Sequence, residues 1–301
     1  MQGLVFWAVY PILWFISILP FRIFYMVSDL IFVLVYYIIG YRRKTVQNNL
    51  RLVFPEKPES ELKRIEKKFY SHMCDMFLEM IKSISISESE LKKRFVCTNL
   101  EYLRKLESTN KSIIIMCGHY ATYEWMNALQ LHDLKFHAFG IYKRIRNRHF
   151  DRLAKRIRGR FNGTLISTYN ATEKIRHNEE NGIKGHYAMI ADQSPKLNRA
   201  KHWINFMGIR VPVFEGSDRL ARKLDMNVVY LQVEKKKRGF YEARLVPITE
   251  NATKDPEHYI TKKFIELLEE QIRKKPEYYL WTHKRWKHRN EPIPKNAEII
   301  N

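Results

Sequence analysis

Residues 112–125 read SIIIMCGHYATYEW and begin with the clearest strand pattern in the chain. Residues 112–118 form a short apolar run of the length expected for a buried strand, and residues 121–132 are predicted to be a helix. Gly118 supplies the turn between them. A buried strand that enters a helix through a glycine turn places His119 at the carboxyl edge of the sheet, where open α/β sheets hold their ligands.

The pattern continues on the carboxyl-terminal side, where short apolar strands alternate with amphipathic helices. Strands are predicted at residues 135–142, 163–168, 186–192, 227–233 and 240–248, and helices at residues 146–161, 171–181, 215–226 and 256–276. A connecting loop is expected between residues 192 and 215. The sequence therefore predicts an α/β fold with a mixed central sheet flanked by helices, in one catalytic domain over residues 45–296.

The amino-terminal segment is predicted to bind a membrane. Residues 2–21 carry no charge, and about 20 residues at ~1.5 Å each match a hydrocarbon layer of ~30 Å. The run lacks a basic region before it and a small-residue cleavage pattern after it, so we expect it to be retained. The second apolar run, residues 30–41, is short for a span and follows Asp29, which favours an interfacial or core helix.

The cations that follow these runs predict the orientation of the protein. Arg42, Arg43 and Lys44 come directly after the second run, which indicates that the remainder lies on the cytoplasmic side. Residues 1–44 are therefore predicted to be a membrane anchor. The alternative is a pair of buried core helices, because residues that are apolar around a whole helix also occur in large cores.

The charge of the chain predicts an anionic partner. The 53 Lys and Arg residues against 32 Asp and Glu residues give a net charge of +21. Nucleic acid, anionic lipid and an acidic carrier protein all fit this charge, but no nucleic-acid-binding module is evident, so nucleic acid is not expected. Three cysteines cannot form a closed set of disulfides. Without a zinc-ligand pattern or a phosphate-binding glycine loop, neither a metal nor a cofactor is predicted.

His119 and Glu124 form an H-x4-E pair that suits general-base chemistry. On a continuous helix the two side chains would point about 140° apart, so the pair works only if His119 lies in the turn and Glu124 folds back towards it. Glu124 would then orient the imidazole as the acidic member of a Ser-His-Asp triad does. No G-x-S-x-G elbow is present, so a substrate hydroxyl would take the place of the serine. The alternative is a loop histidine beside an unrelated helical glutamate.

Four ordered blocks add a resemblance to this pattern. They are GHYATYEW, GIYKRIRNRHFDRLAKRIRGR, ADQSPK with NFMGIRVPVFEG, and PEYYLWTHKRWKHR. Their order and spacing resemble the lipid A biosynthesis acyltransferase family, within the lysophospholipid acyltransferase-like superfamily, over essentially the whole chain. The resemblance implies a glycerolipid acyltransferase-like fold, an acyl-carrier-protein thioester as acyl donor and a lipid A precursor as anionic lipid acceptor. It also implies an enzyme of the inner membrane whose catalytic domain faces the cytoplasm.

The resemblance assigns roles to particular residues. It implies that His119 is the catalytic base and Glu124 its acidic partner, and it places Arg156, in a D-x4-R arrangement, and Asp192 in the catalytic set. Asp192 ends a predicted strand, so it could meet His119 at the sheet edge. A guanidinium group could bind a phosphate or counter an oxyanion. The alternative for each residue is an Arg–Asp pair that only ties loops together.

The same blocks supply candidates for substrate binding. These are Tyr142, Lys143, Arg144, Asn147, Arg158 and Gln193. The chain has Tyr-Lys-Arg where members commonly have Tyr-Arg-Pro, and lysine follows DQSP where many have glycine. These differences leave a lysophospholipid or an amino-acid-containing lipid open as the acceptor, and a basic membrane-associated binding protein is the alternative from another class.

The carboxyl-terminal block has a further pattern. In WTHKRWKHR, residues 281–289, two tryptophans alternate with lysine and arginine. Such alternation predicts a patch at the level of lipid headgroups.

Overall fold

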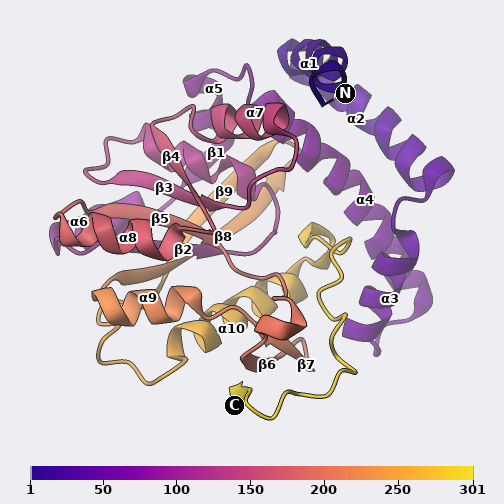
Figure 1. The fold of residues 1–301 in the computed structure, drawn as a ribbon. Coiled ribbons are helices and arrows are strands. Elements are labelled where there is room, and N and C mark those ends of the chain that lie inside the picture. Colours follow the sequence, from indigo (N-terminus) through magenta and orange to yellow (C-terminus); the bar gives the residue numbers. More distant parts are fainter. Residues whose placement is uncertain (1, 301) are drawn as a thin grey trace.

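The computed structural model describes residues 2–300, and a seven-stranded sheet forms the centre of this part of the chain (Figure 1). The strand order is β1-β9-β8-β2-β5-β3-β4. The strands are β1 Phe95–Cys97, β2 Ile113–Cys117, β3 His137–Tyr142, β4 Gly163–Ser167, β5 Gly185–Ile190, β8 Asn227–Lys237 and β9 Phe240–Thr249. Only the β8–β9 hairpin pairs antiparallel within this sheet. The mixed sheet confirms the predicted fold class.

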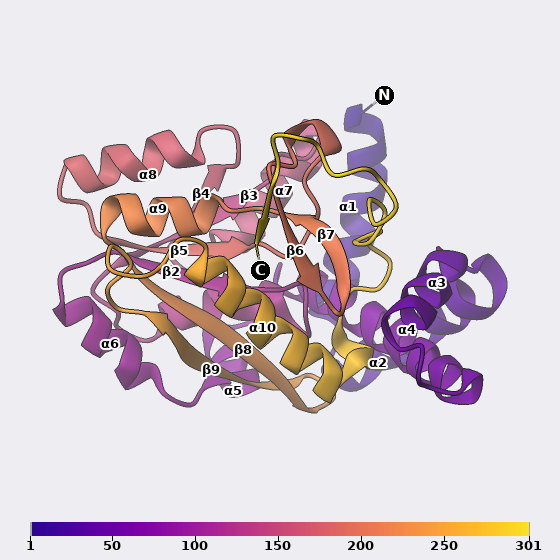
Figure 2. The same cartoon turned by 90° about the horizontal axis from the view of Figure 1, so that it is seen from below.

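Helices flank the sheet, as the sequence predicts. They are α4 Glu59–Lys82, α5 Glu88–Arg94, α6 Leu100–Ser108, α7 Arg148–Arg158, α8 Ala171–Glu180, α9 Gly216–Leu224 and α10 Tyr259–Lys274. Helix α10 lies over β2 and β8 and packs against α9, whereas α5 and α6 pack against β9 (Figure 2). All of β2 is buried in the middle of the sheet, because parallel strands with helical cover have no solvent-facing side.

The segment after β2 differs from the predicted helix. Residues Tyr123–Leu131 form a 3-10 helix, η2, which begins after Ala121 adopts a left-handed backbone with φ of 49°. The indole of Trp125 is fully buried and donates to the backbone carbonyl of Glu79 on α4 at 3.1 Å. Packing against α4 therefore holds this segment in a tighter turn than residue propensity alone would predict.

The loop expected between residues 192 and 215 contains a hairpin that the sequence analysis missed. Strands β6 His202–Phe206 and β7 Ile209–Val213 pair antiparallel, and β10 Glu298–Ile300 adds to β6. Met207 and Gly208 both have positive φ, of 55° and 77°, as a two-residue hairpin turn requires. Strand β10 also lies beyond residue 296, where the predicted catalytic domain ends.

The amino-terminal segment forms two helices with a break that the predicted boundaries did not place. Helix α1 covers Gln2–Ile18, and α2, Phe21–Val33, continues as a π-helix, η1, over Leu34–Ile39. Pro20 separates them, because proline has no backbone N–H to continue a helix. Among residues 2–300, the one helix long and apolar enough to cross a membrane is Phe21–Ile39, whereas the predicted span was residues 2–21. The charges of Arg22 and Asp29 do not interrupt it, since the backbone bonds of a helix close within the helix itself.

Both amino-terminal helices keep large apolar side chains exposed. On α1 these include Leu4, Trp7, Ile12, Trp14 and Phe15, and on α2–η1 they include Ile23, Met26, Leu30, Val33, Tyr37 and Ile38. Such a contiguous apolar surface is rare on a soluble protein and fits membrane association. The alternative of two buried core helices is wrong for these faces.

Candidate active site

His119 and Asp192 meet at the carboxyl ends of two neighbouring parallel strands. Strands β2 and β5 pair so that Cys117 lies opposite Ile190, and each strand is followed at the second position by one of the two side chains. His119 Nδ1 lies 2.6 Å from Asp192 Oδ1. Asp192 is 2% exposed, whereas the side chain of His119 is 16% exposed, so one face of the imidazole remains accessible.

The ion pair sets the protonation of both groups. Burial alone would lower the pKa of His119, but the carboxylate of Asp192 outweighs it and raises that pKa above 6.5. Burial would raise the pKa of Asp192, but the imidazole of His119 and its backbone N–H keep that pKa below its usual value. Asp192 therefore stays ionised, and an ionised Asp192 favours a proton on Nδ1 of His119.

The turn that carries His119 is held by its neighbours. The backbone N–H of Leu280 donates to the carbonyl of His119 at 3.1 Å, and Tyr120 forms a β-bridge with Tyr279. A Cβ on Gly118 would lie 2.6 Å from Cδ1 of Leu268 on α10. Glycine is needed here because the backbone and α10 approach each other closely.

The structure pairs Glu124 with Arg158 rather than with His119. Arg158 Nε lies 2.9 Å from Glu124 Oε2, and its Nη2 donates to the other carboxylate oxygen, which makes the pair bidentate. Among residues 2–300, no hydrogen bond joins Glu124 to His119. The carboxylate of Glu124 still helps to raise the pKa of His119 against the effect of burial, although less than Asp192 does. The carboxylate that directly contacts the imidazole is thus that of Asp192.

The second sequence block lies on β3, α7 and the loop between them. Arg156 is exposed on α7, and the described residues offer it no hydrogen bond or ion pair. Asp151 accepts the backbone N–H of Ile145 at 2.8 Å and the hydroxyl of Tyr142 at 3.4 Å, so it shapes the loop. Lys143 is exposed.

Two further candidates of this block have contrasting positions. Arg144 is exposed, next to Lys143 in the loop. The side chain of Asn147 accepts the backbone N–H of His149 at 3.0 Å, which caps the first turn of α7.

Gln193 and Tyr123 also contact the imidazole of His119. The side-chain nitrogen of Gln193 lies 3.1 Å from Nε2 of His119, and the ring of Tyr123 meets the imidazole edge to face at 4.9 Å. Gln193 therefore occupies the position from which a polar group of a substrate would approach Nε2.

Three residues of the last block also surround Asp192, and sequence reasoning missed them. The hydroxyl of Tyr279 lies within hydrogen-bonding reach of Asp192. Burial lowers the pKa of His283 to about 4, so it is neutral near pH 7. Arg285 is fully buried and donates through Nη1 to Ser194 Oγ and to the carbonyl of Pro212, both at 2.9 Å. No sequence spacing connects these residues with Asp192.

The predicted headgroup patch at residues 281–289 is wrong. Trp281 and Trp286 are 0% and 1% exposed, and their indole nitrogens donate to the carbonyls of Pro276 and Phe206. Lys284, Lys287 and Arg289 are exposed, but the two tryptophans that would sit at headgroup level are packed inside the protein with their N–H groups satisfied.

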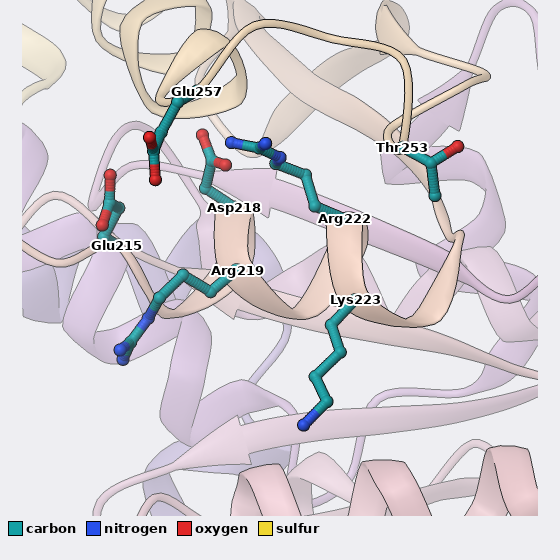
Figure 3. A pocket seen from close by; sticks show the side chains of 7 residues that line it. All are labelled: Glu215, Asp218, Arg219, Arg222, Lys223, Thr253 and Glu257. Carbon is teal, nitrogen blue, oxygen red and sulfur yellow. The ribbon is translucent and has the colours of Figure 1, made fainter.

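The open hollow shown in Figure 3 lies elsewhere. It measures about 330 Å³ and lies between α9 and the segment that precedes α10. Its lining residues are Glu215, Asp218, Arg219, Arg222, Lys223, Thr253 and Glu257. None of them is a predicted site residue, and their mixed charges do not define one ligand. In the part of the chain that the structure describes, no group of three His, Cys, Asp or Glu side chains is arranged to hold a metal ion.

The arrangement around His119 is suited to proton abstraction. When Asp192 holds the proton on Nδ1, Nε2 has a lone pair that can accept a proton from a substrate hydroxyl. His119 and Asp192 form an acid–base pair at the edge of the sheet. Arg158 on α7 makes a bidentate pair with Glu124 beside them.

Comparison with known proteins assigns the family. Residues 1–288 match the family model described as bacterial lipid A biosynthesis acyltransferase. A lipid A biosynthesis acyltransferase of Haemophilus influenzae is 24% identical over 242 residues, which cover 80% of this chain and 74% of that protein. The lipid A biosynthesis lauroyltransferase of Escherichia coli K12 is 22% identical over 297 residues, which cover 96% of this chain and 93% of that protein. The chain therefore belongs to the bacterial lipid A biosynthesis acyltransferase family.

Proposed function

We propose that this enzyme transfers a fatty acyl group from an acyl-carrier-protein thioester to a hydroxyl of a lipid A precursor, with His119 as the general base. The observation that carries the proposal is the 2.6 Å contact between His119 Nδ1 and Asp192 Oδ1 at the carboxyl edge of the sheet. Family membership supports the reaction class and a lipid acceptor.

The reaction follows from Nε2, the imidazole nitrogen of His119 that does not contact Asp192. Nε2 of His119 removes the proton from the acceptor hydroxyl as its oxygen attacks the thioester carbonyl. The tetrahedral intermediate collapses, the C–S bond breaks, and the imidazolium returns the proton to the leaving thiolate. Asp192 stabilises the imidazolium throughout. Gln193, at 3.1 Å from Nε2, would contact the hydroxyl or the oxyanion.

Cations of the second block would bind the anionic groups of the substrates. Arg158 is fixed by its two bonds to Glu124, and a fixed guanidinium suits an oxyanion or a phosphate better than a mobile one. Exposed Lys143, Arg144 and Arg156 would meet phosphates of the acceptor or the acidic carrier protein.

Tyr142 and Asn147 would act less directly. Both support the loop that presents these cations, since Tyr142 donates to Asp151 and Asn147 caps α7.

The anchor and the catalytic domain would divide at residue 44. We assign residues 1–44 to the membrane and residues 45–296 to acyl transfer, at the inner membrane with the catalytic domain facing the cytoplasm. Arg42, Arg43 and Lys44 support this orientation. An acyl carrier protein would reach the enzyme from the same side.

Mass spectrometry of lipids from a strain that lacks the protein tests the acceptor. The proposal expects lipid A to lose one acyl chain and to regain it when the gene is restored. Unchanged lipid A together with an altered lysophospholipid or amino-acid-containing lipid would favour the other acceptors, which the differences in the second and third sequence blocks leave open.

A further inference from the structure

The amino-terminal helices have one face on the catalytic domain and one face free. On α2–η1, the buried residues are Phe24, Ser28 and Tyr36. They are four and eight residues apart, so they share one face of the helix, and this face packs against α4. The opposite side exposes Leu30 and Ile38, which are 70% and 73% exposed. The helix therefore packs one face on the catalytic domain and leaves an apolar face free.

Charged side chains of the catalytic domain contact the middle of α2. Ser28 Oγ lies 2.8 Å from Asp75 Oδ1 on α4, and Asp29 forms an ion pair of 2.7 Å with Arg238 in the β8–β9 turn. Arg238 also bonds to Asp75, to which Lys235 of β8 contributes a further ion pair at 3.2 Å. A four-charge network thus lies beside the centre of this helix.

Polar contacts continue towards both ends of α2–η1. Near its start, Tyr25 donates to the buried carboxylate of Glu79 at 2.9 Å. Near its end, Lys67 of α4 lies over the ring of Tyr37 at 5.9 Å. The catalytic domain therefore accompanies α2–η1 along its whole length, as the parallel course of α2 and α4 in Figure 1 shows.

Helix α1 is held to the catalytic domain at both ends. Phe6 stacks on His149 of α7 at 5.4 Å, and Lys82 of α4 donates to the carbonyl of Ser17 at 2.7 Å. Its free side exposes Trp7 and Phe15. Helix α7 also carries Arg158, which bonds to Glu124 at the candidate active site. Helix α1 therefore packs against the helix that supplies Arg158.

We infer that α1 and α2–η1 lie flat in one leaflet of an anionic bilayer and do not cross it. A spanning Phe21–Ile39 helix would be about 28 Å long and would place Asp29 near the bilayer centre. The α4 side chains and the β8–β9 turn beside it, with Arg238 and Lys235, would then enter hydrocarbon, where charges are strongly disfavoured. In the plane of the interface, the apolar faces enter the acyl chains and the charged network stays at headgroup level.

This inference rests on the membrane association in the proposed function but not on the acyl-transfer chemistry. It commits to one occupant, an anionic phospholipid leaflet, because the exposed helix faces are apolar and the chain carries a net charge of +21. Such a position would bring the active-site edge near α7 to the surface that supplies a lipid acceptor.

Depth measurement on spin-labelled protein tests the inference. Single cysteines would replace Leu4, Ile12, Ile23, Leu30 and Ile38 in the full chain, in a Cys97→Ser background, because Cys74 and Cys117 are buried. The protein would be bound to vesicles of phosphatidylethanolamine and phosphatidylglycerol, and oxygen and nickel-chelate accessibility would report depth. Tyr169→Cys, at an 84% exposed loop position, is the aqueous control.

The expected result is a shallow depth of about 5–10 Å at all five sites, with Leu30 no deeper than Ile23 and Ile38. An impermeant thiol reagent should also label Arg22→Cys and Tyr41→Cys, at the two ends of α2–η1, from the same side of the bilayer. A depth maximum at Leu30 with labelling of the two ends from opposite sides would overturn the inference, and so would aqueous accessibility at every site. A His119→Ala background must give the same depths, which separates this test from failure of the acyl-transfer proposal.

Discussion

The carboxylate of Asp192 raises the pKa of His119 and stabilises its imidazolium form, and a single substitution tests both effects. Asp192→Asn removes the charge that raises the pKa of His119, while burial continues to lower it. The neutral base would then persist to lower pH, so the acid limb of the pH–rate profile should move to lower pH. At the same time kcat should fall by about 10²–10⁴-fold, because the imidazolium loses its stabilising partner.

A pH–rate series of kcat and of kcat/KM on purified wild-type and Asp192→Asn enzyme measures both effects. A lower kcat with an unmoved acid limb would contradict control of the His119 pKa by Asp192. Glu124→Gln is the informative comparison. Glu124 bonds to Arg158 and not to His119, so this substitution should move the acid limb less than Asp192→Asn does.

Arg158 and Arg156 form a matched pair on one helix. Arg158 is fixed by Glu124 in a bidentate pair, whereas Arg156 is exposed and has no partner among residues 2–300. Arg158→Lys cannot reproduce two parallel bonds, so we expect a loss in kcat of about 10–100-fold, against about 3-fold or less for Arg156→Lys. Steady-state kinetics of both variants measures the two losses in kcat. A larger loss for Arg156→Lys than for Arg158→Lys would assign the oxyanion or phosphate role to Arg156.

The sequence could place His119 and Asp192 at strand ends, but it could not make them neighbours. That depends on β2 and β5 pairing side by side, and strand order is set by non-local packing. Glu124 is close to His119 along the chain, so spacing favoured it as the direct partner. The 3-10 turn and the bond to Arg158 direct its carboxylate elsewhere.

At the scale of elements, β2 and α10 are in direct contact beneath the active site. Gly118→Ala would place a Cβ 2.6 Å from Leu268, which is fully buried, so we expect a loss of about 1–3 kcal/mol in the free energy of unfolding. Denaturant unfolding of detergent-solubilised protein measures it.

A double-mutant cycle supplies the control for this contact. Leu268→Ala alone should cost about 2–5 kcal/mol, but it also removes the atoms that the new methyl group of Gly118→Ala would meet. The double variant should therefore be more stable than the sum of the single losses predicts. Additive losses would show that α10 and the Gly118 turn do not meet.

Elements were predictable where burial and periodicity agreed, as in β2, β5, the β8–β9 hairpin and α10. The β6–β7 hairpin was missed because its turn, Met207 and Gly208, lacks the asparagine or aspartate that usually marks such turns. Its short strands were also part of a stretch without clear alternation. The break between α1 and α2 was missed because residues 2–21 carry no charge and were predicted as one span, although Pro20 ends a helix there.

At the scale of the whole molecule, the positive charge and the apolar helices should act together at a membrane. Lys44 is exposed directly after α2–η1, so Lys44→Gln should weaken partitioning into anionic vesicles by about 1 kcal/mol, roughly fivefold. Vesicle sedimentation at low salt measures this. Lys174→Gln on α8 is the control, because α8 lies away from the amino-terminal helices in Figure 1.

The same experiment has an internal check. The effect of Lys44→Gln should shrink at high salt and vanish on zwitterionic vesicles, because exposed charges are screened. Equal effects of the two substitutions would mean that charge near the anchor has no special part in membrane binding. The sequence predicted an anchor from composition, but only the fold shows which helix faces remain free.

Acyl transfer by purified wild-type, His119→Ala and His177→Ala protein tests directly whether His119 is the general base. Each would receive an acyl-carrier-protein thioester and a lipid A precursor, with the product measured by mass spectrometry; His177 is exposed on α8 and serves as the matched control. We expect wild-type rates for His177→Ala and a loss of about 10²–10⁴-fold for His119→Ala with the fold retained. Wild-type activity in His119→Ala would show that His119 is not the general base.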